Sequence, residues 1–116
     1  MDRLLKYPKS ARLRRRTEYL ALQREGRRRH TAHLVVISRP AAGAGSRLGV
    51  TVSKRIGNSV IRNRVKRLLR EAFRGRQAEI PSPTDMVVIA KSGAETLTYA
   101  QAATEFAAAL GLTAHG

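Results

Sequence analysis

The sequence contains no cysteine, which excludes disulfide bonds and thiolate metal ligands. Its longest apolar runs are four or five residues, such as 34–37 and 86–90, far short of the ~20 residues that cross a membrane. The amino-terminal residues also lack an apolar stretch of signal-peptide length. We therefore expect a cytoplasmic protein with no membrane partner.

Acidic and aromatic side chains are scarce. The eight acids are scattered and form no carboxylate pair suited to two-metal phosphodiester chemistry. His30 and His33 are three residues apart, and no cysteine or carboxylate accompanies them, so a surface or partner-facing role is favoured over metal binding. We predict no catalytic residue, no metal site and no organic cofactor. With three tyrosines and two phenylalanines, base stacking must also be sparse.

Positive charge is abundant and unevenly distributed. The chain has 23 Lys and Arg against 8 Asp and Glu, a formal net charge of +15. Residues 1–30 and 54–76 each carry a net +8, residues 31–53 carry +2, and residues 77–116 carry −3. Two basic blocks, rich in arginine rather than lysine, indicate a shaped surface for phosphates. Nucleic acid is therefore the favoured partner.

Hydrophobic periodicity and turn residues predict one α+β domain spanning residues 1–116. The expected order is helix, strand, strand, helix, strand, helix, at residues 17–26, 33–38, 48–53, 59–74, 86–90 and 98–110. This order is typical of a sandwich with a small central sheet and flanking helices. Residues 1–16 form a basic arm, either ordered or disordered without RNA, and residues 111–116 form a short tail.

Two features mark the last predicted helix. Thr98 and Gln101 fit a capping box, and Gly111 suits the carboxyl-terminal cap. We expect its apolar face to follow residues of helical spacing, namely Tyr99, Ala103, Phe106 and Leu110.

The predicted helix over residues 59–74 is amphipathic. One arc is apolar, with Phe73 at its edge, and contains Ile61, Val65, Leu68, Leu69 and Ala72. The opposite arc is polar and contains Asn63, Lys66, Arg67, Arg70 and Arg74. Basic residues also recur at i, i+4 spacing, where like charges repel, and only Glu71 relieves them locally. Nine basic residues against one acid over 54–76 favour a polyanion-binding face over a merely solvated one.

The segment 57–74, GNSVIRNRVKRLLREAFR, resembles the signature of the ribonuclease P protein family. The core of the resemblance is the Arg-Asn-Arg triplet at 62–64, followed by Lys66 and Arg67. The flanking strands and a first helix with Thr17-Glu18-Tyr19 and Gly26 also fit, so the likeness covers roughly residues 10–110.

The resemblance implies the protein subunit of a ribonucleoprotein endonuclease that removes the 5′ leader of precursor tRNA. Hydrolysis would belong to the catalytic RNA, with Mg²⁺ bound mainly by that RNA, and no protein oligomer would be required. The implied contacts to the catalytic RNA are Arg62, Asn63, Arg64, Lys66, Arg67 and Arg70. The implied leader contacts are Tyr19, Ser53, Lys54 and Arg55. The family fold is ribosomal-protein-like, with a left-handed β-α-β crossover.

Several of these roles stay open at the level of sequence. Arg64 lies beside the apolar arc, so it either braces the helix or reaches RNA from the flank. Tyr19 either stacks on a base or belongs to the core, and Asn63 either binds RNA or is an ordinary surface residue. Related sequences often carry an aromatic residue at the positions of Gln23 and Ile37, which implies that leader binding here depends more on charge than on stacking.

Three other functions compete with this interpretation. A ribosomal or other structured-RNA assembly protein would share the basic helix but not the whole signature. A DNA-binding regulator would need a helix and a tight turn before residue 59, where the pattern of residues 48–53 predicts a strand. A protein nuclease would need the missing carboxylate cluster.

Overall fold

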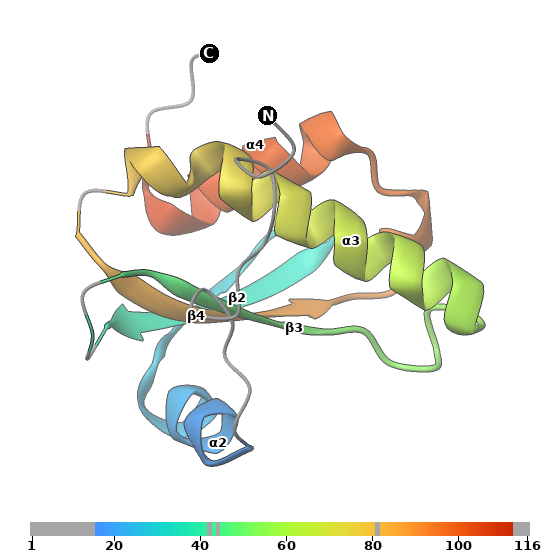
Figure 1. The fold of residues 1–116 in the computed structure, drawn as a ribbon. Coiled ribbons are helices and arrows are strands. Elements are labelled where there is room, and N and C mark those ends of the chain that lie inside the picture. Colours follow the sequence, from blue (N-terminus) through green and yellow to red (C-terminus); the bar gives the residue numbers. More distant parts are fainter. Residues whose placement is uncertain (1–15, 42, 44, 81, 113–116) are drawn as a thin grey trace.

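The computed structural model describes residues 16–41, 43, 45–80 and 82–112, which form one sheet covered by helices on both faces (Figure 1). Helix α2 (Arg16–Glu25) packs on one face. Helices α3 (Ser59–Arg76) and α4 (Tyr99–Leu110) cover the other, which confirms the predicted α+β sandwich. The predicted arm and the end of the predicted tail, residues 1–15 and 113–116, lie outside the described residues. No helix of the described part has both the length and the apolar composition to cross a membrane.

The sheet contains strands β1 (Arg27–His30), β2 (Leu34–Pro40), β3 (Arg47–Thr51) and β4 (Thr84–Ala90), in the order β1-β2-β4-β3. Strands β1 and β2 are antiparallel, as are β2 and β4, whereas β3 and β4 are parallel. Figure 1 places β3 in front of β4 with α3 above both, so the β3-α3-β4 crossover is left-handed. This rare hand agrees with the family fold.

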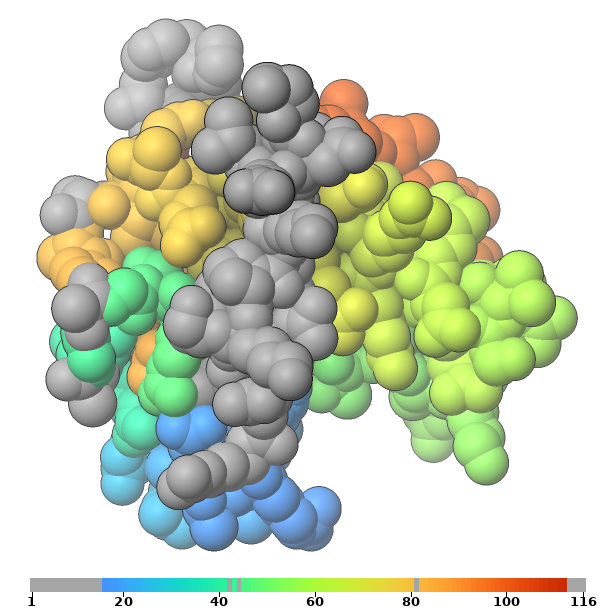
Figure 2. Space-filling model, viewed as in Figure 1, coloured from blue at the N-terminus to red at the C-terminus, as the bar shows by residue number. Residues whose placement is uncertain are grey.

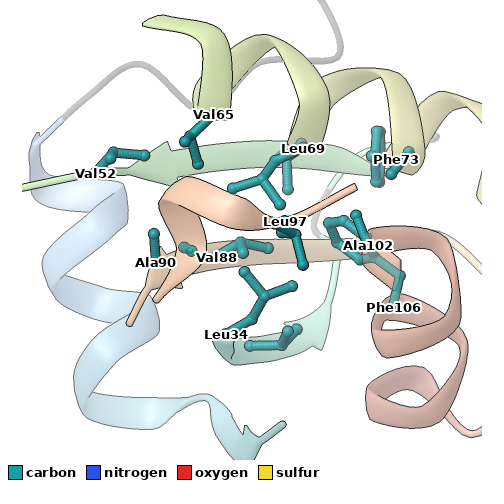
Figure 3. Packing of buried hydrophobic residues seen from close by; sticks show 14 of the residues in the cluster. Leu34, Val52, Val65, Leu69, Phe73, Val88, Ala90, Leu97, Ala102 and Phe106 are labelled. Atoms are coloured by element: carbon teal, nitrogen blue, oxygen red, sulfur yellow. The ribbon is translucent and has the colours of Figure 1, made fainter. Parts of the chain in front are cut away.

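Alternating side chains of the strands build two separate cores. Even-numbered residues of the strands, including Leu34 and Val88, face α3 and α4 and pack with Val65, Leu69 and Phe106 (Figure 3). Odd-numbered residues form a much smaller cluster with α2, whose members are Leu22, Val35, Ile37 and Val87. The main core therefore lies between the sheet and helices α3 and α4, and only a small core lies between the sheet and α2.

Asn58 caps α3, a role that was not predicted, its side-chain oxygen accepting from the backbone N–H of Ile61 at 3.0 Å. The cap signals of α4 were right. The capping box of α4 is present, with both reciprocal hydrogen bonds between Thr98 and Gln101, at 2.9 and 3.2 Å. Gly111 ends this helix with φ 71°, the left-handed conformation that favours glycine.

Several details differ from the prediction. Strand β1 was not predicted, and two short 3-10 helices occur at Gln77–Glu79 and Ala94–Thr96. Strand β3 ends at Thr51 rather than at residue 53, and α2 begins at Arg16, within the predicted arm. Phe73 is fully buried rather than at the edge of the apolar face. Tyr99 is 47% exposed, because α4 turns Ala102, Phe106 and Ala109 toward the core instead.

Candidate RNA-binding surface

Helix α3 carries a row of four basic side chains one turn apart, Arg62, Lys66, Arg70 and Arg74, which we call the basic ridge. All four are partly buried, whereas Asn63 and Arg67 on the outer side of the helix are exposed. The buried side of α3 is apolar, so packing against the sheet fixes the rotation of the helix and the direction of the ridge.

The amino-terminal end of α3 is held rigidly. Arg62 donates from Nε to the carbonyl oxygen of Gly57 at 3.2 Å, which positions the first guanidinium of the ridge. A Cβ atom at Gly57 would lie 2.8 Å from the Ile61 side chain, so no larger residue fits there without displacement. Gly57 therefore allows the turn to pack closely against the first residues of α3.

Besides Arg62, the predicted RNA contacts Arg64 and Arg67 also bind groups within the protein. Arg64 donates a hydrogen bond to the backbone carbonyl of Glu95, on the segment after β4, which agrees with the bracing role considered for it. Arg67 pairs with Glu71 at 3.8 Å, but both side chains are largely exposed, so the pair is weak. The structure therefore places Arg64 away from the ridge and leaves Arg67 accessible.

Tyr19 of α2 lies directly over Gly49 of β3. A Cβ atom at position 49 would lie 2.5 Å from the Tyr19 hydroxyl oxygen, so only glycine allows the ring this close to the sheet. Burial raises the pKa of Tyr19, against the opposing effects of a backbone hydrogen bond from Val50 and the positive charge of Arg70. Tyr19 and Arg70 therefore lie near one another although they belong to different helices.

The ring of Tyr19 is partly exposed and partly packed on the small α2 core, so both roles considered for it are compatible with its position. Figure 2 shows a hollow between α2 and the first half of α3, with the segment after β3 beside it. Ile37 is fully buried beneath α2, so it offers no surface for a base.

Ser53, Lys54 and Arg55 lie in the turn that joins β3 to α3. The backbone N–H of Ile56 closes this turn on the carbonyl of Ser53 at 3.1 Å. All three predicted leader contacts are exposed, while Val52 and Ile56 on either side are buried. The turn is thus anchored by two apolar side chains and presents its polar ones to solvent.

Arg47 is a structural residue near the site that the sequence did not reveal. Its guanidinium binds the fully buried Asp85 with two hydrogen bonds, of 3.1 and 2.8 Å, and binds Glu18 of α2 at 2.8 Å. The hydrogen bond to Asp85 is the main cause that raises the pKa of Arg47, so the guanidinium stays charged. Because Glu18 precedes Tyr19, this network fixes the position of the tyrosine.

Among the described residues, no group of three or more His, Asp or Glu side chains is arranged to hold a metal ion. His33 instead pairs with Glu105, its Nδ1 lying 2.6 Å from a carboxylate oxygen that belongs to α4. Thr31 and the backbone N–H of His33 donate to the other oxygen, at 2.5 and 2.8 Å. These contacts tie the β1–β2 loop to α4.

A basic ridge, a nearby half-buried tyrosine and an exposed basic turn define a small α+β protein of the nucleic-acid-binding class. The family model for ribonuclease P matches residues 7–113. The chain belongs to the ribonuclease P protein family.

Individual relatives agree with this assignment. The ribonuclease P protein component of Citrifermentans bemidjiense is 43% identical over 105 residues, 90% of each chain. That of Desulfovibrio desulfuricans is 45% identical over 102 residues, covering 84% of this chain and 78% of the relative.

Solved structures give the same result. The ribonuclease P protein of Staphylococcus aureus matches with a TM-score of 0.79 and 29% identity, covering 89% of this chain and 94% of that one. The Thermotoga maritima protein matches with a TM-score of 0.76 and 30% identity, covering 85% and 94%. These likenesses support the ribonuclease P interpretation over that of a ribosomal assembly protein.

Proposed function

We propose that this protein is the protein subunit of ribonuclease P and binds the catalytic RNA through α3. The observation that carries the proposal is the basic ridge, four cations on one side of a helix whose rotation is fixed by its packing. Phosphate oxygens would relieve the repulsion between successive ridge residues. Asn63 and Arg67, exposed beside the ridge, would add a hydrogen-bonding amide and a further cation. Arg64 would act indirectly, by bracing the helix on Glu95.

The 5′ leader of precursor tRNA would lie in the hollow between α2 and α3. Tyr19 offers the exposed part of its ring as a stacking surface, and such a contact contributes about 1–3 kcal/mol per base. Ser53, Lys54 and Arg55 stand beside the hollow and would contact the leader backbone. One aromatic ring among many cations predicts weak preference for particular leader sequences.

Hydrolysis would be performed by the RNA subunit in the cytoplasm, with Mg²⁺ held mainly by RNA. The described carboxylates support this proposal, because no three of them, alone or with histidine, are grouped to hold a metal ion. The protein would contribute substrate binding and neutralisation of phosphate charge where two RNAs meet. A single copy of the chain would suffice.

Reconstitution tests this function. The purified protein is added to a bacterial ribonuclease P RNA and a precursor tRNA at low Mg²⁺ concentration, and cleavage at the mature 5′ end is measured. We expect cleavage to rise with protein concentration, while protein alone cuts nothing. Cleavage by the protein alone, or no effect on the RNA, would contradict the proposal.

A further inference from the structure

Strand β1 is composed of Arg27, Arg28, Arg29 and His30, and all four residues are exposed. The strand forms the edge of the sheet and pairs only with β2, so β2 and β4 separate it from β3 and the basic ridge. Strands β1 and β3 are three strand spacings apart, which is about 14 Å. The β1 edge is therefore a basic surface distinct from the one on α3.

The charges of β1 point to both sides of the sheet. Arg28 lies opposite Ile37 and therefore faces the α2 side, whereas Arg29 lies opposite Val36 and faces the α3–α4 side. Arg27 shares the side of Arg29. Three guanidinium groups thus occupy about 7 Å of strand and surround its outer edge.

The described carboxylates do not neutralise these charges. Glu25, the acid nearest in sequence, pairs with Arg39 at 2.9 Å and with Arg24 at 3.8 Å. The other described acids contact groups outside β1, namely Glu18, Glu71, Glu79, Asp85, Glu95 and Glu105. Within the described part of the chain, the three arginines of β1 consequently have no acidic partner.

We propose that the β1 edge is a further RNA-binding surface, which binds the phosphodiester backbone of an RNA segment other than those on the basic ridge and in the hollow. Arginine forks match phosphate oxygens, and contacts of this kind are independent of base sequence. A lipid surface fits less well, because the strand has no apolar side chain to enter the bilayer interface. The protein would then bind RNA at the β1 edge of the sheet as well as on α3 and in the hollow.

A charged edge strand also has a simpler explanation, since charges on sheet edges prevent pairing between molecules. Comparing glutamine with lysine separates the two roles. The variant Arg28→Gln/Arg29→Gln keeps the edge polar but removes two phosphate-binding cations, whereas Arg28→Lys/Arg29→Lys keeps the charge. Both changes lie on exposed positions, and thermal unfolding verifies that each variant is folded.

The matched control is Arg24→Gln/Arg76→Gln, which lowers the net charge equally. Both control arginines already have a carboxylate partner, Glu25 and Glu79 respectively. The probe is a fluorescein-labelled single-stranded oligouridylate, whose affinity is measured by anisotropy between 50 and 200 mM salt. No catalytic RNA or cleavage is involved, so this test stands or fails separately from the reconstitution.

We expect Arg28→Gln/Arg29→Gln to bind the probe on the order of tenfold more weakly at about 0.1 M salt, with the salt slope reduced by about 1.4. The lysine variant should retain most of the affinity, and the control should change it little. In a background lacking Arg62, Lys66 and Arg70, the two glutamines should weaken the remaining binding further, because the β1 edge is a separate surface. An unchanged slope in the glutamine variant, or an equal loss in the control, would overturn the proposed role of the β1 edge.

Discussion

Arg47 binds Asp85 through two hydrogen bonds, and Asp85 is completely inaccessible to solvent. The same guanidinium binds Glu18, so one side chain connects β3, β4 and α2. A buried carboxylate is stable only while it is paired, and here the pairing partner comes from 38 residues away along the chain.

Replacement of Arg47 by alanine should therefore be strongly destabilising. Arg47→Ala leaves the charge of Asp85 buried without a partner, at a cost of about 3–5 kcal/mol. Urea unfolding measures this change, and the exposed Arg67→Ala, which breaks the pair with Glu71, should cost under about 1 kcal/mol. If the two substitutions lowered the free energy of unfolding equally, the buried Arg47–Asp85 pair would contribute no more to stability than the exposed pair.

Gly49→Ala should displace the ring of Tyr19 from the sheet. The new methyl group would overlap the ring, so the tyrosine moves toward solvent and its raised pKa falls back toward 10.0. The measurement is an ultraviolet titration of phenolate in a Tyr7→Phe/Tyr99→Phe background, where Tyr19 is the only tyrosine. An unaltered pKa would mean that the ring accommodates the methyl group in place.

The same titration has a consequence for stability. The pKa of Tyr19 in the folded protein lies above its unfolded value, because burial disfavours the phenolate. Stability from this side chain is complete below about pH 10 and falls as the pH rises through the folded-state pKa. Gly49→Ala should weaken that alkaline loss.

Glu105 should make the fold sensitive to acid. Partial burial raises the pKa of this carboxyl, but the hydrogen bonds from Thr31 and His33 outweigh it and hold the pKa below its ordinary value. The stabilisation is complete above about pH 4.3 and is lost as the pH falls through the folded-state pKa. Glu105→Gln should cost about 2 kcal/mol at neutral pH, since it removes hydrogen bonds to a charged group.

Chemical unfolding at a series of pH values between 7 and 3 tests this linkage. The wild type should lose more stability over this range than Glu105→Gln, whose side chain does not titrate. Glu79→Gln, at an exposed acid that pairs with Arg76, is the control and should retain the wild-type pH dependence. Parallel pH curves for Glu105→Gln and the wild type would contradict the assigned role.

Loss of the basic ridge should weaken RNA binding, whereas loss of Arg64 should lower thermal stability. The combined variant Arg62→Ala/Lys66→Ala/Arg70→Ala should weaken binding to the catalytic RNA and lower the salt slope by about 2, because three phosphate contacts disappear. Arg64→Ala should lower the thermal midpoint and change the slope little, since its guanidinium binds the Glu95 carbonyl. Filter binding and thermal unfolding of both variants measure the two effects.

If the ridge variant binds with normal affinity at moderate salt while unfolding normally, α3 does not contact RNA through these residues. A large loss of slope in Arg64→Ala would instead place its side chain on the RNA.

Local sequence signals predicted the helices well. The capping box of α4 and the amphipathic pattern of α3 are short-range, so Thr98, Gln101 and the apolar arc containing Val65 and Leu69 could be recognised directly. The buried stripe of α4 was misjudged because alanines such as Ala102 form part of it, and alanine is common on either face of a helix.

Long-range features escaped prediction. Strand β1 has no apolar alternation, so its pairing with β2 follows from the hairpin and not from its own residues. The contact between Tyr19 and Gly49 depends on how α2 packs against the sheet, and so does the network around Arg47. Both join residues that are far apart in the sequence. The hand of the crossover came only from the family resemblance, since no local pattern encodes it.

The separate core beneath α2 has a dynamic consequence. Helix α2 is held by a small apolar cluster and by Arg47, and the main core lies on the opposite face of the sheet. Amide hydrogens of α2 should therefore exchange through local opening, at a lower free energy than those of α3, β2 and β4. An RNA strand stacked on Tyr19 would suppress this local opening, so binding of the RNA would order α2.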